Sequence, residues 1–214
     1  MDRPEIYIET DVLKHDQVSM LDLLFLLPVT VTRPQDIPKT IIYMNDIKSI
    51  QAAVRIMRRW MNELGYPPEA EKLVQPYFAI MAKSDKQRIS REFAKLDEDC
   101  SSCRIILATD AYGLGIDNPD VRVVQWLLPP SMSALYQRMG RAMRCGRGRA
   151  VYTLLYPAWC IGSISDCPGS RGNKKKSDRC LRKTGLAFFQ DTTYSNVSIS
   201  ERRRRCLIQS MCIK

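Results

Sequence analysis

The 214-residue chain is 45% hydrophobic and carries 33 Lys and Arg against 23 Asp and Glu, a net charge of +10. This length is enough for one α/β domain of about 150 residues followed by a tail. No apolar run reaches the roughly 18 residues that a transmembrane helix needs, so we expect no membrane partner.

The first residues, Met1 to Glu5, lack the basic start, apolar core and small-residue cleavage site of a signal peptide. We therefore expect a nuclear or cytosolic protein, with nuclear preferred. The eight cysteines are then expected to be mostly reduced thiols.

The charge is uneven along the chain. Residues 161–214 hold 12 Lys and Arg against four acidic residues, a net charge of +8, so the rest is nearly neutral. A basic tail suggests an anionic partner such as nucleic acid, and the alternative is a solvated, disordered tail.

Strand-like and helix-like runs alternate, which is typical of βαβ units and a parallel sheet. In chain order, we expect strands at 5–9, 40–44, 77–80, 104–109, 121–127 and 150–156. Helices are expected at 21–27, 47–64, 84–96 and 131–139. The fold class is therefore α/β, a parallel sheet with flanking helices over residues 1–157. Residues 158–214 form a basic, irregular or partly helical tail.

Helix ends are marked by capping residues. Asp46, directly after Asn45, is a good N-cap for the second helix, and Gly65 lies where a C′ glycine ends one. Ser84 with Gln87 forms a capping-box pattern for the third helix, whose buried stripe is Ile89, Phe93 and Leu96. Ser131 is the expected cap of the last helix.

The segment from Ala108 to Asp117 brings a buried strand into a loop with two glycines and two acids. At the carboxyl end of a parallel strand, such a loop is where α/β folds bind ligands. Glycines let a backbone approach phosphate closely, and free N–H groups can face an anion. On its own, the pattern also fits an ordinary βα turn.

The segment from Gln137 to Arg149 contains five arginines, at positions 138, 141, 144, 147 and 149. The first three recur at every third position, so they share a face if the segment is helical. Guanidinium groups suit phosphate oxygens, although a solvated basic helix end would show the same composition.

Together, these two segments resemble a known family. Ala108–Asp117 resembles helicase motif V, and Gln137–Arg144 resembles motif VI, whose family form is Q-x-x-G-R-x-G-R. Thr40–Asp46 is similar to motif IV, and Tyr77–Phe93 to the segment between. The Ala108–Arg122 form points to RecQ-type superfamily 2 DNA helicases. The resemblance covers about residues 3–157 and implies the second, RecA-like motor domain of such an enzyme.

The resemblance implies a role for each matching residue. Arg144 would be the arginine finger on the γ-phosphate of ATP, with Arg141 supporting it. Thr109 and Asn45 would contact the DNA backbone. Four residues would line the nucleotide cleft or couple it to domain closure: Gln137, Gly140, Gly115 and Asp117.

The resemblance also implies parts that the sequence does not show. ATP and Mg²⁺ need a phosphate-cradling Walker A segment and an acidic box, which the family's first RecA-like motor domain provides, in cis or in trans. The glycines of Gly169–Ser177 have the wrong spacing for Walker A, and the acids at 97–99 are interpreted as a turn. We therefore expect no measurable ATPase from the chain alone.

Three positions depart from the family pattern: Met143 replaces a glycine, Cys145 an acid, and Phe78 a frequent histidine. They leave two functions open. One is the C-terminal motor domain of an ATP-dependent 3′–5′ DNA helicase, and the other is a catalytically dead nucleic-acid-binding remnant.

The remaining cysteines, histidine and basic runs carry weaker hypotheses. RecQ enzymes often have a zinc-binding subdomain after the motor. The five tail cysteines form no C-x₂-C pair, so we predict no metal site, and the alternative is that residues 158–214 are a truncated zinc-binding subdomain. Cys100 and Cys103 are interpreted as two thiols in a turn, and His15 as an exposed loop residue. The basic runs at 174–176 and 202–205 fit nuclear-import signals, DNA contacts or solvated charge.

Overall fold

The computed structural model describes residues 6–29, 33–95, 102–112, 121–142 and 150–160. These residues form one six-stranded sheet in the order β1-β6-β5-β2-β4-β3, and every neighbouring pair is parallel. The strands are β1 (Ile6–Val12), β2 (Thr40–Tyr43), β3 (Val74–Tyr77), β4 (Ile105–Ala108), β5 (Arg122–Trp126) and β6 (Ala150–Tyr156). The predicted α/β class with a parallel sheet is confirmed.

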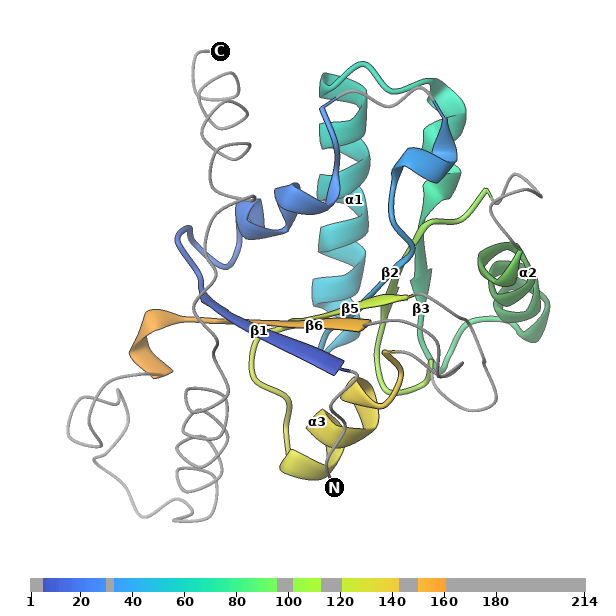
Figure 1. The fold of residues 1–214 in the computed structure, drawn as a ribbon. Helices are drawn as coiled ribbons and strands as arrows, with labels where there is room; N and C mark the ends of the chain where they lie inside the picture. The colour runs from blue at the N-terminus through green and yellow to red at the C-terminus, as the bar shows by residue number, and fades with distance from the viewer. Residues whose placement is uncertain (1–5, 30–32, 96–101, 113–120, 143–149, 161–214) are drawn as a thin grey trace.

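Three α-helices flank this sheet: α1 (Ile47–Glu63), α2 (Lys83–Ala94) and α3 (Met132–Met139). In Figure 1, α1 stands on one side of the sheet, α3 lies on the other, and α2 lies beyond the β3 edge. Short 3₁₀ helices fill the connections at Leu21–Leu26, Pro34–Asp36, Pro68–Leu73 and Ala158–Cys160. The predicted first helix is thus a 3₁₀ helix.

Strand residues alternate between two apolar cores, one on each face of the sheet. On β2, Ile42 packs with the buried face of α1, whereas Ile41 and Tyr43 pack with α2 and α3. Both faces are therefore covered, as is typical of parallel sheets. This explains why the central strands read as continuous apolar runs.

The caps of α1 and α3 form as predicted. The Asp46 carboxylate accepts the backbone N–H of Ser49 at 2.8 Å, and Ser131 Oγ accepts that of Ala134 at 3.1 Å. Gly65 follows α1 with a φ of 77°, a left-handed conformation that favours glycine.

Two predictions about the α2 unit were wrong. The strand predicted at 77–80 is instead Val74–Tyr77. This strand contains Pro76, which is tolerated because β3 lies at the edge of the sheet. Ile80, beyond the strand, is 79% exposed. The capping box does not form, because α2 begins at Lys83 and Ser84 therefore lies inside its first turn.

His15 is also placed differently from the prediction of an exposed loop residue. Its side chain is only 25% exposed, and Nδ1 lies 3.2 Å from Oδ1 of Asp22, which is itself buried. The same carboxylate accepts the backbone N–H groups of Lys14 and His15. A buried carboxylate needs such donors, and this need orders the loop after β1.

Replacing Asp46 with Ala removes the acceptor that caps α1, so we expect the free energy of unfolding to fall by about 1 kcal/mol. Hydrogen bonds from Ser49 hold the pKa of Asp46 below its usual value. The contribution is therefore present at neutral pH and is lost as the pH falls through that lowered pKa. Urea denaturation at several pH values measures both effects.

The matched control is Asp46→Asn, which keeps a capping oxygen but cannot titrate. It should stay near wild-type stability at neutral pH and lose the pH dependence. Equal stability of Asp46→Ala and wild type at pH 7 would contradict the capping role.

Candidate functional site

The carboxyl ends of three neighbouring strands meet at one edge of the sheet. β2 is central, with β5 on one side and β4 on the other, so the chain order reverses there. Asn45 follows β2, Thr109 and Asp110 follow β4, and Leu127 follows β5. Such a switch point is where open α/β sheets bind ligands.

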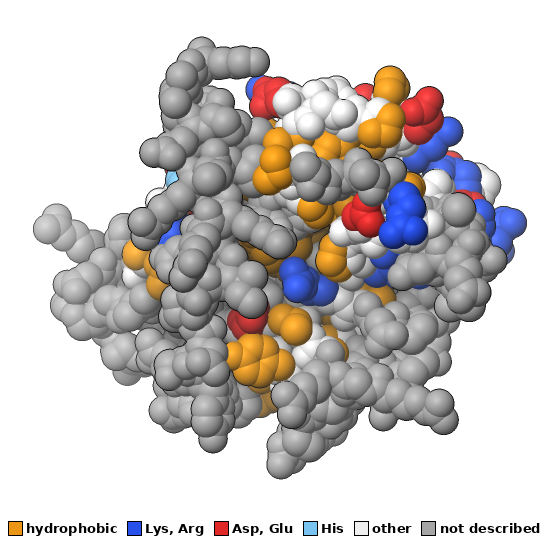
Figure 2. Space-filling model, turned by 45° about the horizontal axis from the view of Figure 1, so that its top comes forward, with side chains coloured by type: hydrophobic (Ala, Val, Ile, Leu, Met, Phe, Trp, Pro, Cys, Tyr) orange, Lys and Arg blue, Asp and Glu red, His pale blue; other side chains and the backbone are white. Residues whose placement is uncertain are grey.

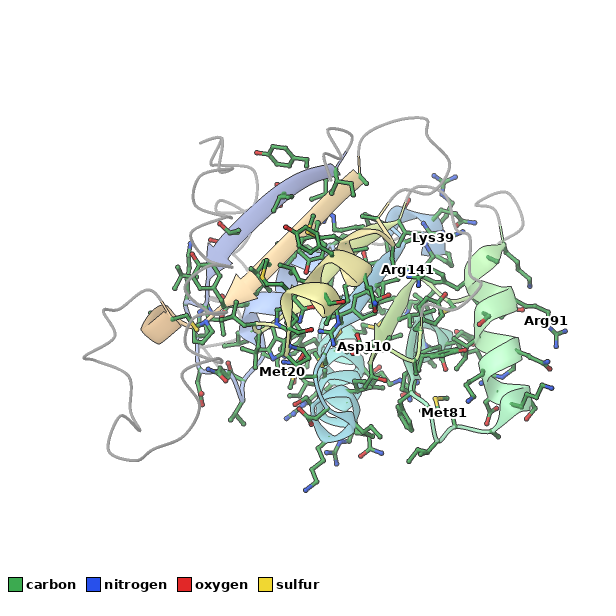
Figure 3. All side chains as sticks on the ribbon, turned by 90° about the horizontal axis from the view of Figure 1, so that it is seen from below. Met20, Lys39, Met81, Arg91, Asp110 and Arg141 are labelled. Carbon is green, nitrogen blue, oxygen red and sulfur yellow. The ribbon has the colours of Figure 1, made fainter. Side chains whose placement is uncertain are left out.

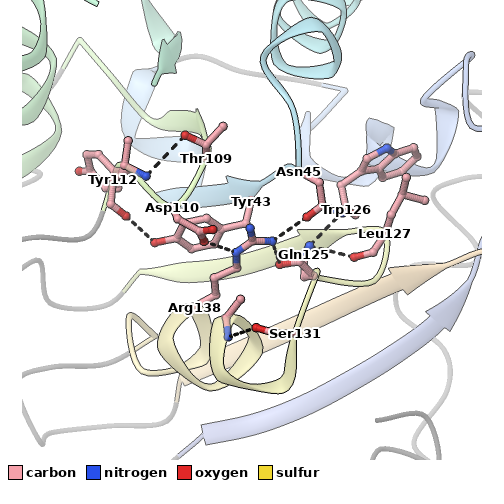
Figure 4. Close-up of polar contacts among 12 residues, drawn as sticks. Tyr43, Asn45, Thr109, Asp110, Tyr112, Gln125, Trp126, Leu127, Ser131 and Arg138 are labelled. Carbon is pink, nitrogen blue, oxygen red and sulfur yellow. Dashed lines mark hydrogen bonds and ion pairs between the residues drawn. The ribbon is translucent and has the colours of Figure 1, made fainter. Parts of the chain in front are cut away.

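A buried arginine from α3 joins these three strand ends. Arg138 is 2% exposed, and its Nε donates to Asp110 Oδ1 at 2.7 Å. Its Nη1 donates to Asn45 Oδ1 at 3.0 Å and to Gln125 Oε1 at 2.9 Å (Figure 4). The guanidinium also lies 5.4 Å from the centre of the Tyr43 ring. The guanidinium group of Arg138, whose donors have a fixed planar arrangement, thus links α3 to β2, β4 and β5.

Two partners of Arg138 also hold the turn that follows β5. Gln125 is fully buried, and its Nε2 donates to the carbonyl of Leu127 at 2.8 Å. Leu127 has a φ of 65°, a left-handed conformation that costs a non-glycine residue about 1 kcal/mol. Asn45 Nδ2 donates to the next carbonyl, that of Leu128, at 2.8 Å. These two amides stabilise the strained turn that leads into α3.

An aromatic cluster supports the β4 side of the site. The Tyr43 hydroxyl donates to the Tyr112 carbonyl at 2.8 Å. The Tyr112 ring packs edge-to-face against Tyr77 at 4.6 Å and Phe93 at 6.2 Å between ring centres. Such pairs add about 0.5–1.5 kcal/mol each beyond their burial. The backbone up to residue 112 is therefore anchored from β2, β3 and α2.

Thr109 lies between this cluster and the ion pair. Its backbone N–H donates to the Tyr77 carbonyl at 3.3 Å, and its own carbonyl accepts the Tyr112 N–H at 3.1 Å. The side-chain oxygen lies 3.5 Å from the backbone nitrogen of Ala111. The structure thus brings the predicted residues Asn45 and Thr109 to one edge of the sheet. Asn45 accepts a hydrogen bond from Arg138, and Thr109 directly precedes Asp110, the ion-pair partner of Arg138.

The predicted motif VI residues lie on and just after α3. Gln137 is exposed, Gly140 is the C-cap of the helix, and Arg141 is partly buried. Nη1 of Arg141 is buried and forms no hydrogen bond among the described residues. Seen from below in Figure 3, Asp110 and Arg141 both lie beside α3. Gly115, Asp117 and Arg144 lie outside the described residues, as do Met143 and Cys145.

Three members of this network were not predicted from the sequence: Arg138, Asp110 and Gln125. Arg138 was recognised only as one of a series, with no role. The available signal was Gln125, a polar side chain in the middle of an otherwise apolar strand, because such a residue needs a buried partner.

Tyr152 on β6 adds a second buried polar group near Arg138. Burial raises its pKa above the usual value for a phenol, and the nearby Arg138 charge opposes that shift. Tyr152 is therefore neutral at physiological pH. Its hydroxyl has no hydrogen-bond partner within the described ranges.

The described residues give no support for a metal or redox site. They contain no group of three or more His, Cys, Asp and Glu side chains that could hold a metal ion. Cys103 is buried, and burial raises the pKa of its thiol to about 12. A thiol of this kind is a poor nucleophile at neutral pH. Cys100 and the tail cysteines from 167 onward lie outside the described residues.

The model of the helicase conserved C-terminal domain matches residues 20–146, more than half of the chain. The chain belongs to this helicase family. The matched region contains Asn45, Thr109 and the whole of α3, so the site described above falls within the family domain.

Curated relatives that are similar to this helicase domain include helicases of the RecQ type. The chain is 30% identical over 130 residues to the human ATP-dependent DNA helicase Q4, covering 58% of the chain and 10% of that protein. It is 41% identical over 71 residues to the RecQ-like DNA helicase BLM of Xenopus laevis, covering 33% and 5%. The chain thus spans about a tenth or less of the length of these relatives.

Solved structures agree on the fold. The second domain of a DEAD-box helicase bound to an RNA duplex matches 89% of the chain and 70% of that domain, with a TM-score of 0.56 at 12% identity. The helicase Lhr of Mycobacterium smegmatis, bound to single-stranded DNA and AMP-PNP, matches 90% of the chain and 23% of its own, with a TM-score of 0.52 at 17% identity. The predicted RecA-like helicase fold is confirmed.

In the part of the chain that the structure describes, no helix combines the length and the apolar character that crossing a membrane requires.

Replacing Arg138 with Met removes the shared donor and leaves buried Gln125 and the Asp110 carboxylate without it. Breaking a buried ion pair in this way costs about 3–5 kcal/mol. Asp110 is 55% exposed, so water replaces part of the loss. We expect the free energy of unfolding to fall by about 2–3 kcal/mol in urea denaturation.

Arg141→Met is the matched control, since it removes the same group three residues later. Arg141 is less buried and has a buried nitrogen without a partner, so its loss should cost less than about 1 kcal/mol. Equal losses for the two variants would show that Arg138 is not the organising contact.

Proposed function

We propose that this chain is the second motor domain of an ATP-dependent 3′–5′ DNA helicase, in which ATP hydrolysis drives strand separation. The observation that carries the proposal is the Arg138 network. It joins the loops expected to contact DNA, at Asn45 and Thr109, to the helix that leads into the expected phosphate-binding arginines.

On the nucleic-acid side, Asn45 and Thr109 contact the DNA backbone. Contacts to phosphate and sugar are independent of sequence, which a translocating motor requires. The structural relative Lhr was solved with single-stranded DNA, and the helicase MrfA with DNA. These complexes, together with RecQ-type relatives named as DNA helicases, support DNA as the partner.

On the nucleotide side, Arg141 and Arg144 would face the γ-phosphate of an ATP held by a first RecA-like motor domain in cis or in trans. Gln137, Gly140, Gly115 and Asp117 would line the rest of the cleft. The buried Nη1 of Arg141 has no partner within the described ranges, so it fits a donor reserved for phosphate. Mg²⁺ would be held by the acidic box of the first domain and would neutralise phosphate charge there.

The proposed mechanism divides the work between the two domains. The first domain would hold ATP and Mg²⁺, and closure of the cleft would bring the arginines to the phosphate, where they would stabilise developing charge. Arg138 keeps α3 at a fixed position relative to the DNA loops. Closure at the nucleotide therefore moves the DNA-contacting loops with it. The proposed setting is the nucleus, with the basic runs at 174–176 and 202–205 as import signals.

The chain alone should show no DNA-stimulated ATPase, because it would lack the phosphate cradle on which the arginines act. Supplied with the first motor domain of a RecQ-type helicase, it should hydrolyse ATP. Replacing Arg141 with Ala should then lower kcat, although by less than the roughly 10³-fold expected for loss of the arginine finger Arg144. A phosphate-release assay measures both results.

Two outcomes would overturn this assignment. One is ATPase of the isolated chain that Arg144→Ala abolishes. The other is a paired protein in which Arg141→Ala leaves kcat unchanged. DNA binding with no nucleotide effect in the paired protein would identify a catalytically dead nucleic-acid-binding domain instead.

A second prediction concerns the DNA side. Thr109→Val keeps the shape of the side chain and removes its hydroxyl, so affinity for single-stranded DNA should fall about five-fold, the loss of one hydrogen bond worth about 1 kcal/mol. Fluorescence anisotropy with a labelled oligonucleotide measures this change. Thr153→Val, on the distant strand β6, is the control and should leave affinity unchanged.

A further inference from the structure

The outward surface of α1 carries an unusual row of basic side chains, which we call the α1 crest and define as Lys48, Arg55 and Arg59. All three are exposed. At 3.6 residues per turn, their directions around the helix axis fall within about 40° of one another. The buried residues of α1, centred on Met57, lie on the opposite side. The crest therefore faces directly away from the core.

The crest has no acidic neighbour at helical spacing along most of its length. The positions three and four residues from Arg55 are Gln51, Ala52, Arg58 and Arg59. Acids occur only at its ends: Asp46 is engaged in capping, and Glu63 is the last residue of α1. Like charges four residues apart on a helix cost about 0.2–0.5 kcal/mol, so this pattern is mildly destabilising.

At α2, by contrast, two basic side chains pair with nearby acids. Arg88 lies 3.7 Å from Asp85, and Lys95, the C-cap residue, lies 2.8 Å from Glu92. In Figure 2, Lys and Arg side chains gather on the right, the side on which α2 lies in Figure 1, with acidic side chains among them. Among the described residues, no crest member forms a salt bridge. The crest thus leaves three charges available for a partner.

The position of the crest identifies the partner. Lys48 is three residues after Asn45, so the row of charges begins at the loop proposed to contact the DNA backbone. From there to Arg59, α1 rises about 16 Å, the length of about five phosphates along one strand of a duplex. We propose that the α1 crest binds the phosphate backbone of the same DNA beyond the motor site. This proposal rests on the proposed function.

The test compares the full chain with two triple variants of equal charge change. The crest variant is Lys48→Gln, Arg55→Gln and Arg59→Gln, which keeps helix propensity nearly constant. The control variant is Lys72→Gln, Lys83→Gln and Arg91→Gln, at three exposed positions on the Pro68–Leu73 turn and on α2. Both keep residues 161–214, so any contribution of the basic tail cancels.

Affinity for a tailed DNA duplex is measured by fluorescence anisotropy over a range of salt concentrations. Each lost phosphate contact reduces the slope of log affinity against log salt by about 0.9. The crest variant should therefore lower the slope by about 2–3, and the control variant by less than about 1. A six-nucleotide single strand, long enough only for the motor site, should bind the two variants equally.

The outcomes separate the two levels of the proposal. Suppose that the crest and control variants give equal slopes on the duplex while Thr109→Val still weakens binding. This result would overturn the proposal that the crest binds DNA and would leave the proposed function intact. No effect of Thr109→Val on any DNA would count against the proposed function itself. Unchanged DNA slopes with selective loss of polyglutamate binding in the crest variant would show that the crest takes an acidic polypeptide and would likewise overturn the proposal.

Discussion

A guanidinium group removed from water must have its donors satisfied, and this constraint organises the molecule around Arg138. The side chain is 2% exposed and has carboxylate, amide and aromatic partners from three different strands. Each partner is at or near the carboxyl end of its strand. A helix can meet this requirement only in one position and rotation, so α3 is fixed relative to the sheet.

The same constraint accounts for local features that would otherwise be costly. The left-handed backbone at Leu127 is held by a hydrogen bond from Nε2 of Gln125. The side-chain oxygen of Gln125 accepts a hydrogen bond from Arg138. Asn45 divides its amide between Arg138 and the turn after β5. A shared network of this kind is stable only when every member is present. It therefore suits the proposed function, in which the DNA-contacting loops and the nucleotide-facing arginines move as one body.

The sequence predicted the architecture well because its strongest signals are local. Apolar runs gave all six strands, although β3 was displaced, and Asp46 and Ser131 gave two helix starts. The errors have local causes as well. Pro76 concealed an edge strand, and Ser84 resembled a cap although it lies two residues after the actual N-cap position. His15 was misjudged because its partner Asp22 lies seven residues away across a turn.

The site was only partly predictable. Motif spacing pointed to Asn45 and Thr109, which follow β2 and β4 at the switch point of the sheet, and to Arg141, which lies just after α3. Arg138 was not assigned a role, because its partners are 13 to 93 residues distant in the chain and no periodicity connects them. Long-range polar pairing of this kind becomes visible only when the strand order is known.

The most direct test of the central claim is the coupling between nucleotide and DNA in the paired two-domain protein. The ratio of DNA affinities with and without a non-hydrolysable ATP analogue gives a coupling free energy. Arg138→Lys keeps the charge but cannot donate to all three partners at once, so we expect both ligands to bind while the ratio falls towards one. A folded Arg138→Lys protein with the wild-type ratio would contradict the role of Arg138 as the link between the two surfaces.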